Sequence, residues 1–238
     1  MRKNTIAMAI MCLFVALLPK SGMPEQKPIQ VTLWFDDGWT STYEIAYPIM
    51  KEHGWVGVMS WVVNPNPEQF EVEGQGLMAL EQAQEMYQSG WEISNHTMTH
   101  PRGLNTLSTS DYHMEVVVSQ WALQGMFGSD VTTFTAPFGE GRPGGFTFVR
   151  TMEGGINYPS ESVLKAQFMK KDTTEKVVLS WVQQAKDEDG WLIIGLHAIS
   201  ENPNEWQITE GQFEMLLEVL HRENIRVVIP KEMMLWTN

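Results

Sequence analysis

Apolar residues along this chain gather into short runs that alternate with segments of helical spacing. The runs are rich in β-branched and aromatic residues and are nearly all apolar, without a polar residue at every second position. This pattern predicts strands that are covered on both faces. The predicted strands span Ile29 to Phe35, Val56 to Val63, Trp91 to Ser94, Val131 to Ala136, Trp191 to Leu196 and Ile225 to Ile229.

The segments between these runs carry helix signals. Ser41 with Glu44, and Thr209 with Gln212, have the spacing of capping boxes that begin helices. Further helices are expected over residues 77–88, 110–127 and 173–187. Strands and helices in alternation indicate an α/β fold, either a barrel or a doubly wound sheet. We expect a distorted or incomplete parallel (β/α) barrel of about seven strands in a single domain.

The first 22 residues have the pattern of an export signal. Arg2 and Lys3 precede an apolar run from Ile6 to Leu18, which is short for a membrane span. We expect either a cleaved signal peptide or an uncleaved N-terminal anchor. The protein would then be secreted, periplasmic or held at the cell envelope. Residues 23–238 are enough for one domain with a sizeable core.

Cysteine content and charge narrow the chemistry of that domain. Cys12 is the one cysteine and lies in the apolar run, so a metal site in the domain must use His, Asp or Glu. The whole chain has a net charge of −13, and residues 23–238 hold 13 basic against 29 acidic residues, which gives −16. A surface this negative repels phosphate backbones and anionic lipids. Nucleic acid is therefore a poor partner, and a neutral or cationic substrate is a better one.

Three polar clusters stand at the ends of predicted strands. They are Asp36-Asp37-Gly38, the segment from His96 to His100, and His197. Each cluster alone has an ordinary explanation, as a turn, a surface pair or a satisfied core histidine. Adjacent carboxylates repel each other unless a cation lies beside them, however, and histidines four residues apart are familiar in zinc sites. Because a parallel barrel gathers its strand ends at one mouth, the three clusters together predict a metal-dependent hydrolase.

Four motifs make the chain resemble a known family. They are Phe35-Asp36-Asp37-Gly38, His96-Thr97-Met98-Thr99-His100-Pro101, Ala136-Pro137-Phe138-Gly139 and Leu196-His197. With these residues, in this order, the chain resembles the polysaccharide deacetylases of the NodB-homology type, carbohydrate esterase family four. The four motifs span roughly 160 residues, and residues 23–238 fit the length of the family.

The resemblance implies a role for each polar motif residue. Asp37, His96 and His100 would bind a divalent metal, most simply Zn²⁺, with a position left open for water. Asp36 would be the general base that takes a proton from this water. His197 would be the general acid that protonates the leaving group.

Other residues are candidates for binding the substrate. Pro137 and Phe138 belong to the third motif, and the backbone N–H of Phe138 could support the oxyanion. Trp39 directly follows the Asp-Asp-Gly turn, and Trp206 lies in the loop after the last motif. Both tryptophans are candidates for stacking on sugar rings, with packing in the core as the alternative.

The chain also departs from the family pattern. Thr135 stands where many members have an arginine that pairs with the general base. Arg142, in the loop that follows, is the candidate replacement by its proximity in sequence. The Asp/Trp motif that steadies the catalytic histidine in the family has no counterpart between Gly154 and Asp172.

We therefore expect a metal-dependent enzyme that removes acetyl groups from N-acetylated sugars of a polysaccharide or oligosaccharide. The partner would be an acetylated glycan. One alternative keeps the metal and changes the substrate to an O-acetyl ester or a small amide. Another is a carbohydrate-binding protein that has lost turnover on the same scaffold.

Overall fold

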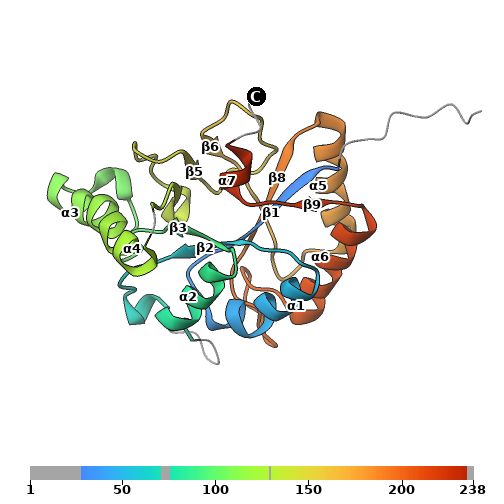
Figure 1. Cartoon of the computed structure of the whole chain (residues 1–238), viewed down its shortest axis with the longest axis horizontal. Coiled ribbons are helices and arrows are strands. Elements are labelled where there is room, and N and C mark those ends of the chain that lie inside the picture. Colours follow the sequence, from blue (N-terminus) through green and yellow to red (C-terminus); the bar gives the residue numbers. More distant parts are fainter. Residues whose placement is uncertain (1–27, 71–75, 129, 235–238) are drawn as a thin grey trace, which may run out of the picture.

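The computed structural model describes residues 28–70, 76–128 and 130–234. Within them, all strands belong to one parallel sheet with the order β6-β5-β4-β3-β2-β1-β8-β7, and β9 pairs with β1 (Figure 1). The strands are β1 (Gln30–Phe35), β2 (Val58–Trp61), β3 (Glu92–Asn95), β4 (Thr133–Thr135), β5 (Phe148–Arg150), β6 (Val163–Leu164), β7 (Gln167–Phe168), β8 (Trp191–Leu196) and β9 (Arg226–Val227). The expected export signal and Cys12 lie outside the described residues.

The sheet curls until its two ends meet in one stretch of chain. β6 and β7 are the end strands, and residues 163–168 contain both. Val163 pairs with Val149 of β5, and Phe168 pairs with Gly195 of β8. The expected distorted parallel barrel is therefore confirmed, with nine strands instead of about seven.

Helices cover the outside of the sheet, and a short helix lies at the start of its strands (Figure 1). The helices are α1 (Tyr47–Glu52), α2 (Leu80–Gln88), α3 (Thr109–His113), α4 (Ser119–Phe127), α5 (Glu175–Glu188), α6 (Glu210–Arg222) and α7 (Pro230–Met233). π-helical turns at Thr42–Ala46 and Met114–Val118 lead into α1 and α4. No helix of the described residues is both long and apolar enough to span a membrane.

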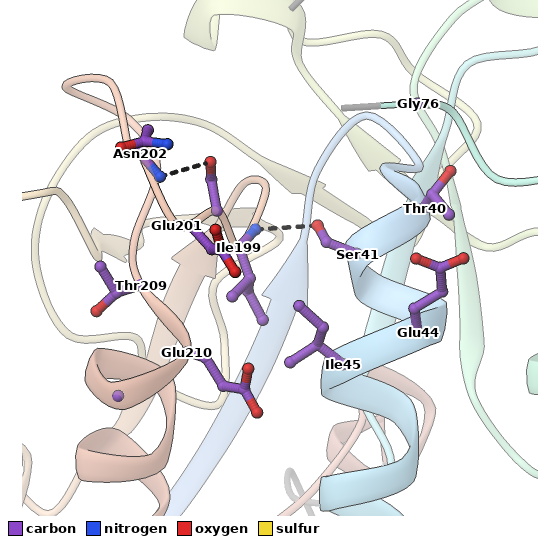
Figure 2. A pocket seen from close by; sticks show the side chains of 12 residues that line it. Thr40, Ser41, Glu44, Ile45, Gly76, Ile199, Glu201, Asn202, Thr209 and Glu210 are labelled. Atoms are coloured by element: carbon purple, nitrogen blue, oxygen red, sulfur yellow. Dashed lines mark hydrogen bonds between the residues drawn. The ribbon is translucent and has the colours of Figure 1, made fainter. Parts of the chain in front are cut away.

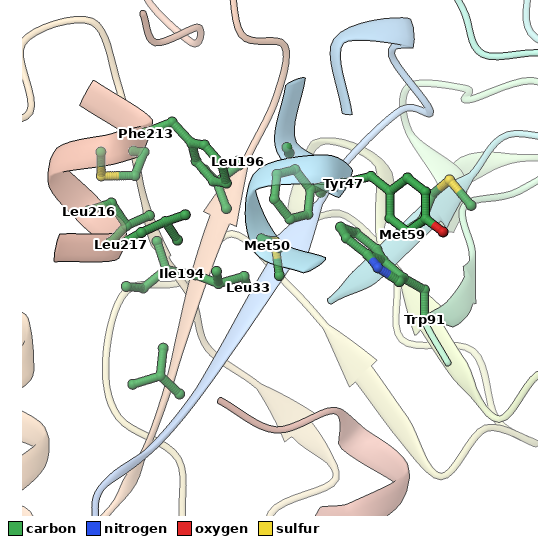
Figure 3. Close-up of a cluster of buried hydrophobic side chains, with 14 of the residues drawn as sticks. Leu33, Tyr47, Met50, Met59, Trp91, Ile194, Leu196, Phe213, Leu216 and Leu217 are labelled. Atoms are coloured by element: carbon green, nitrogen blue, oxygen red, sulfur yellow. The ribbon is translucent and has the colours of Figure 1, made fainter. Parts of the chain in front are cut away.

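Alternate residues of β1 serve two separate cores. Leu33 and Phe35 pack outward in the cluster shared with the helices, where Phe213 and Leu217 of α6 also lie (Figure 3). Trp34 points the other way, into the barrel interior, with Val58, Phe148 and Trp191 among its neighbours. Burial on both faces explains why the strand runs of the sequence lack polar alternation.

Two features of the fold differ from the expectation. Strands β5, β6 and β7 have only two or three residues each, which is too short for a periodic signal, and none of them was predicted. Ser41 does not cap a helix, because its hydroxyl accepts a hydrogen bond from the N–H of Ile199 at 3.0 Å. The capping box of Thr209 and Gln212 is confirmed at the start of α6.

Candidate metal centre and active site

The parallel register brings the polar motifs to one end of the barrel. Phe35 of β1 pairs with Leu196 of β8, so the next residues, Asp36 and His197, leave their strands at the same level. The N–H of Asp36 donates to the carbonyl of Leu196 at 2.8 Å. His96 follows β3, two strands away from β1, at the same edge. The motifs therefore meet at the mouth of the barrel, where such folds carry their active sites.

Three candidate ligand atoms converge on one point at this mouth. Oδ1 of Asp37 lies 3.3 Å from Nε2 of His96 and 3.6 Å from Nε2 of His100. Ligand atoms of all three residues lie within 4.8 Å of one another, and all three residues are buried. Oδ1 of Asp37 is buried and has no hydrogen-bond partner among the described residues. A buried carboxylate oxygen in this position needs a cation.

The hydrogen bonds around the triad leave the correct atoms free for a metal. Nδ1 of His96 lies 2.9 Å from the backbone carbonyl of Thr135. A carbonyl only accepts, so Nδ1 carries the proton, and Nε2 of the neutral ring presents a lone pair toward Asp37. Two imidazole nitrogens and one carboxylate oxygen are a donor set typical of a catalytic zinc site. The residues present therefore fit a divalent ion.

Charge and burial favour the protonation states that a metal requires. Burial opposes ionisation of Asp37, but the close imidazoles of His96, His197 and His100 hold the pKa of Asp37 well below its ordinary range. Burial and the neighbouring His96 lower the pKa of His100 to about 4. At neutral pH the carboxylate is therefore charged and the His100 ring is neutral, as ligands must be.

Strained backbone concentrates at the site. Asp37, Thr97, His100 and Phe138 have φ angles between 54° and 73°, and they are four of the six non-glycine residues with positive φ in the described chain. Each such residue costs of order 1 kcal/mol or more and persists only where its surroundings hold it. Strain of this kind is typical of functional sites.

Buried polar groups hold the loop that carries the two histidines. Oδ1 of Asn95 accepts from the N–H of Thr97 at 2.8 Å. Glu115, in the second π-helical turn, accepts from the N–H of Thr99 at 2.9 Å and from its hydroxyl at 2.6 Å. Such π-helical turns are frequent near functional sites. These bonds fix His96 and His100 without using the imidazoles themselves.

Asp36 is held by a buried arginine that the sequence did not point to. A guanidinium nitrogen of Arg150 and the hydroxyl of Ser60, the latter at 2.8 Å, both donate to Oδ1 of Asp36. Oδ2 is thus the oxygen left toward Nε2 of His197, 3.9 Å away. Arg142 is exposed and does not line the site, so the expectation that it replaces the family arginine is wrong. Arg150 of β5 takes that place.

Small hydroxyl groups fill the space beside this ion pair. The hydroxyl of Thr135 lies 2.8 Å from that of Ser60 and 2.9 Å from that of Ser94. The indole N–H of Trp34 donates to Ser60 at 2.8 Å and to Thr135 at 3.0 Å. These side chains are all fully buried, so Thr135 supports Asp36 through Ser60 instead of pairing with it directly.

His197 is more exposed than the other motif histidines and, unlike His96, makes no hydrogen bond through Nδ1 among the described residues. Its side chain is 20% exposed, and its Nδ1 has no hydrogen-bond partner among the residues described. Its ring contacts are aromatic, with centroids 5.9 Å from Phe168 and 5.8 Å from Trp206. Nε2 points at both carboxylates, 3.9 Å from Asp36 and from Asp37. On the Nδ1 side of the ring, aromatic packing thus takes the place of a hydrogen-bond partner among the described residues.

A cleft of about 750 Å³ opens over these groups. Phe138 and Trp206 line it and are partly exposed, as substrate-binding residues should be. Trp39 also lines it but is only 5% exposed, and its indole N–H donates to Oδ2 of Asp37 at 3.1 Å. Pro137 is buried and does not line the cleft. The structure therefore places Trp39 as support for a metal ligand, with little face left for a sugar.

A second cleft, of about 720 Å³, lies between the loop that joins β8 to α6 and the helical segment that follows β1 (Figure 2). Glu44, Glu201 and Glu210 line it, together with hydroxyl and amide side chains. It holds none of the motif residues and no histidine. The candidate chemistry is therefore confined to the first cleft.

Comparison with known proteins agrees with this geometry. A model of the family described as polysaccharide deacetylase matches residues 24–144, just over half of the chain. The chain belongs to the polysaccharide deacetylase family. It is 28% identical over 123 residues to YxkH of Bacillus subtilis (strain 168), itself a candidate polysaccharide deacetylase. That stretch is 52% of this chain and 41% of the relative, so the chain spans less than half of that protein.

Solved structures of deacetylases share the fold. The chitin deacetylase from Colletotrichum lindemuthianum superposes with a TM-score of 0.59 at 18% identity, over 87% of this chain and 88% of that one. A family 4 acetyl xylan esterase from Clostridium thermocellum gives 0.58 at 18% identity, over 86% and 89%. Members of this fold thus include enzymes named for different acetylated polysaccharides, and the likeness supports the fold alone.

Proposed function

We propose that this protein is a metal-dependent hydrolase that removes acetyl groups from N-acetylated sugars of a polysaccharide or oligosaccharide. One observation carries the proposal. The buried triad of Asp37, His96 and His100 shares its cleft with a second carboxylate, Asp36, and with His197. A metal site needs only the first three residues, whereas acyl transfer to water also needs a proton acceptor and a proton donor.

Asp37, His96 and His100 would hold the ion, and Zn²⁺ suits their two nitrogens and one oxygen. When bound, such an ion supplies Lewis acidity to the acetyl carbonyl and acidifies water. Asp36 accepts the proton of the attacking water at Oδ2, because Arg150 and Ser60 already occupy Oδ1. The ion pair with Arg150 keeps this carboxylate in place.

His197 supplies the second proton transfer. Its Nε2 lies 3.9 Å from Oδ2 of Asp36 in the same cleft, so it can protonate the departing sugar nitrogen. Phe138, in a left-handed turn at the cleft, is our candidate for donating a backbone N–H to the oxyanion. Substrate would lie across Phe138 and Trp206.

Acetate release tests the proposal. Purified protein, loaded with zinc, should release acetate from N-acetylglucosamine oligomers. A chelator should stop the release, and added Zn²⁺ should restore it. Acetate release that persists in metal-free protein would contradict the proposal.

A parallel assay on acetylated xylan separates the ester alternative from the amide reaction. The arginine missing at Thr135 was the reason to consider that alternative. Arg150 now fills the corresponding place beside Asp36, and we therefore favour the amide. Turnover of the xylan ester with none of the amide would reverse this choice.

A further inference from the structure

One arginine at the cleft has no role in the chemistry described so far. Arg102 comes two residues after His100, and its guanidinium carbon lies 3.8 Å from the centre of the Phe138 ring. The Phe138 ring in turn lies 4.6 Å from the ring of His100. Arg102 therefore contacts Phe138, and Phe138 contacts the candidate metal ligand His100. Arg102 also lines the same cleft.

The loops on either side fix this position. The N–H of Gly103 donates to the carboxylate of Glu140 at 2.6 Å, which ties the loop of Arg102 to the loop of Phe138. Leu104 is fully buried and packs so closely on Gly141 that a Cβ there would lie 2.7 Å from it. The backbone next to Arg102 is thus anchored to the loop that carries Phe138, the residue on whose ring the guanidinium lies.

The charge of Arg102 has no partner in the part of the chain that the structure describes. Among the described residues it has no ion pair within 4.0 Å. The other cations near the cleft are paired, Arg150 with Asp36, and Lys170 with Glu205 at 3.3 Å. The chain has a net charge of −13, so a cation without an ion pair among the described residues stands out at the cleft. Such a cation attracts a negatively charged group.

We propose that Arg102 binds a carboxylate carried by the acetylated glycan substrate, on or next to the sugar that is deacetylated. This inference rests on the proposed function. A guanidinium packed against a ring keeps its edge N–H groups for two parallel bonds to a carboxylate. The substrate carries isolated carboxylates on an otherwise neutral chain, because the surrounding negative charge repels a polyanion.

Three tetrasaccharides of equal length test the proposal. The first is the neutral N-acetylglucosamine tetramer. In the second, every other sugar carries a 3-O-lactyl carboxylate, and the third is the same oligomer with these carboxylates converted to amides. The wild-type protein should show a kcat/KM about tenfold higher on the carboxylate oligomer than on its amide. This preference should shrink between about 0.05 and 0.5 M salt.

Substitutions assign the preference to one residue. Arg102→Gln should abolish it through KM and leave the two uncharged oligomers within about twofold, whereas Arg102→Lys should keep part of it. Lys170→Met is the matched control, because Lys170 also lies 3.8 Å over an aromatic ring, that of Trp206, but is already paired. It should change all three oligomers alike.

Each outcome decides the matter. Equal losses on all three oligomers in Arg102→Gln, or no preference in the wild type, would overturn the proposal and leave Arg102 a support for Phe138. If no oligomer releases acetate, the proposed function fails, and calorimetric binding of the same oligomers still tests Arg102. Tighter binding of the carboxylate oligomer than of its amide, lost in Arg102→Gln, would support it.

Discussion

The two sides of the cleft are built on different principles. On the side of β1 and β3, Asp36 is held by a buried ion pair and a hydroxyl, and the side chains of Asp37 and His96 each make a buried hydrogen bond. On the side of β8, His197 is partly exposed, lacks a partner for Nδ1 among the described residues, and rests between two aromatic rings. If the proposed function holds, the proposed base and metal need one fixed geometry, whereas the proposed acid can adjust to the leaving group.

The largest effect is expected on the fixed side. Asp36→Asn should lower kcat by about 10³-fold, because an amide cannot take the proton from water. Metal content, measured by mass spectrometry, should stay that of the wild type, since Asp36 is not among the proposed ligands. A variant that retains most of its kcat would show that another group is the base.

The opposite side should respond in activity alone. His197→Gln should lower kcat by roughly 10²-fold, because a proton donor is lost. The free energy of unfolding should change by less than about 1 kcal/mol, since the side chain is partly exposed and its Nε2 lies 3.9 Å from the carboxylates that it faces, beyond hydrogen-bond distance. A large loss of stability, measured by urea unfolding, would mean that the aromatic side is as tightly built as the other.

Substitution of Arg150 should lower both activity and stability, because its buried ion pair holds Asp36 in place. Arg150→Met leaves Asp36 buried without its cation and should cost about 3–5 kcal/mol of stability. It should also lower kcat by roughly 10- to 100-fold, and Arg150→Lys should recover part of both. Arg142→Met is the matched control and should change neither, because Arg142 is exposed. Equal effects of the two methionine variants would contradict the ion pair.

Sequence reasoning succeeded where long apolar runs end in polar motifs. β1 and β8 have six residues each and β3 has four, and the residues that follow them meet as expected. It failed for Arg150, which ends a three-residue strand and lies 114 positions from Asp36. No local pattern reports a pairing over that distance. The sequence also could not decide between an exposed and a packed Trp39, because the ring that packs on it, Phe70 at 5.8 Å, comes from a distant loop.

A smaller effect is expected from the aromatic side of the cleft. Trp206→Ala should raise KM for oligomers severalfold and lower kcat less, because the ring contacts both His197 and the open cleft. Trp206→Phe should restore most of the loss. Kinetics on oligomers of increasing length would check it, and an unchanged KM would place the sugar elsewhere.

Glu92, at the opposite end of β3, is a buried acid without an ion pair among the described residues. Burial raises its pKa from 4.5 to about 7, against the N–H of Lys231, which donates to it at 2.9 Å. The folded protein therefore holds a proton between pH 4.5 and 7 that the unfolded chain has lost, so stability falls as pH rises through this window. Glu92→Gln should be more stable than the wild type above pH 7, by at most roughly 3 kcal/mol. Unfolding at pH 5 and 8.5 should show a smaller difference at the lower pH, and a constant difference would contradict the shift.

The account depends on Asp37, which follows β1, and His96 and His100, which follow β3, meeting around one cation. Anomalous diffraction at the zinc edge, on crystals of the zinc-loaded protein, tests it most directly. We predict one strong peak at about 2.0–2.2 Å from a carboxylate oxygen of Asp37 and from Nε2 of both His96 and His100. A peak that lies away from these atoms, or no peak in fully loaded crystals, would contradict the account.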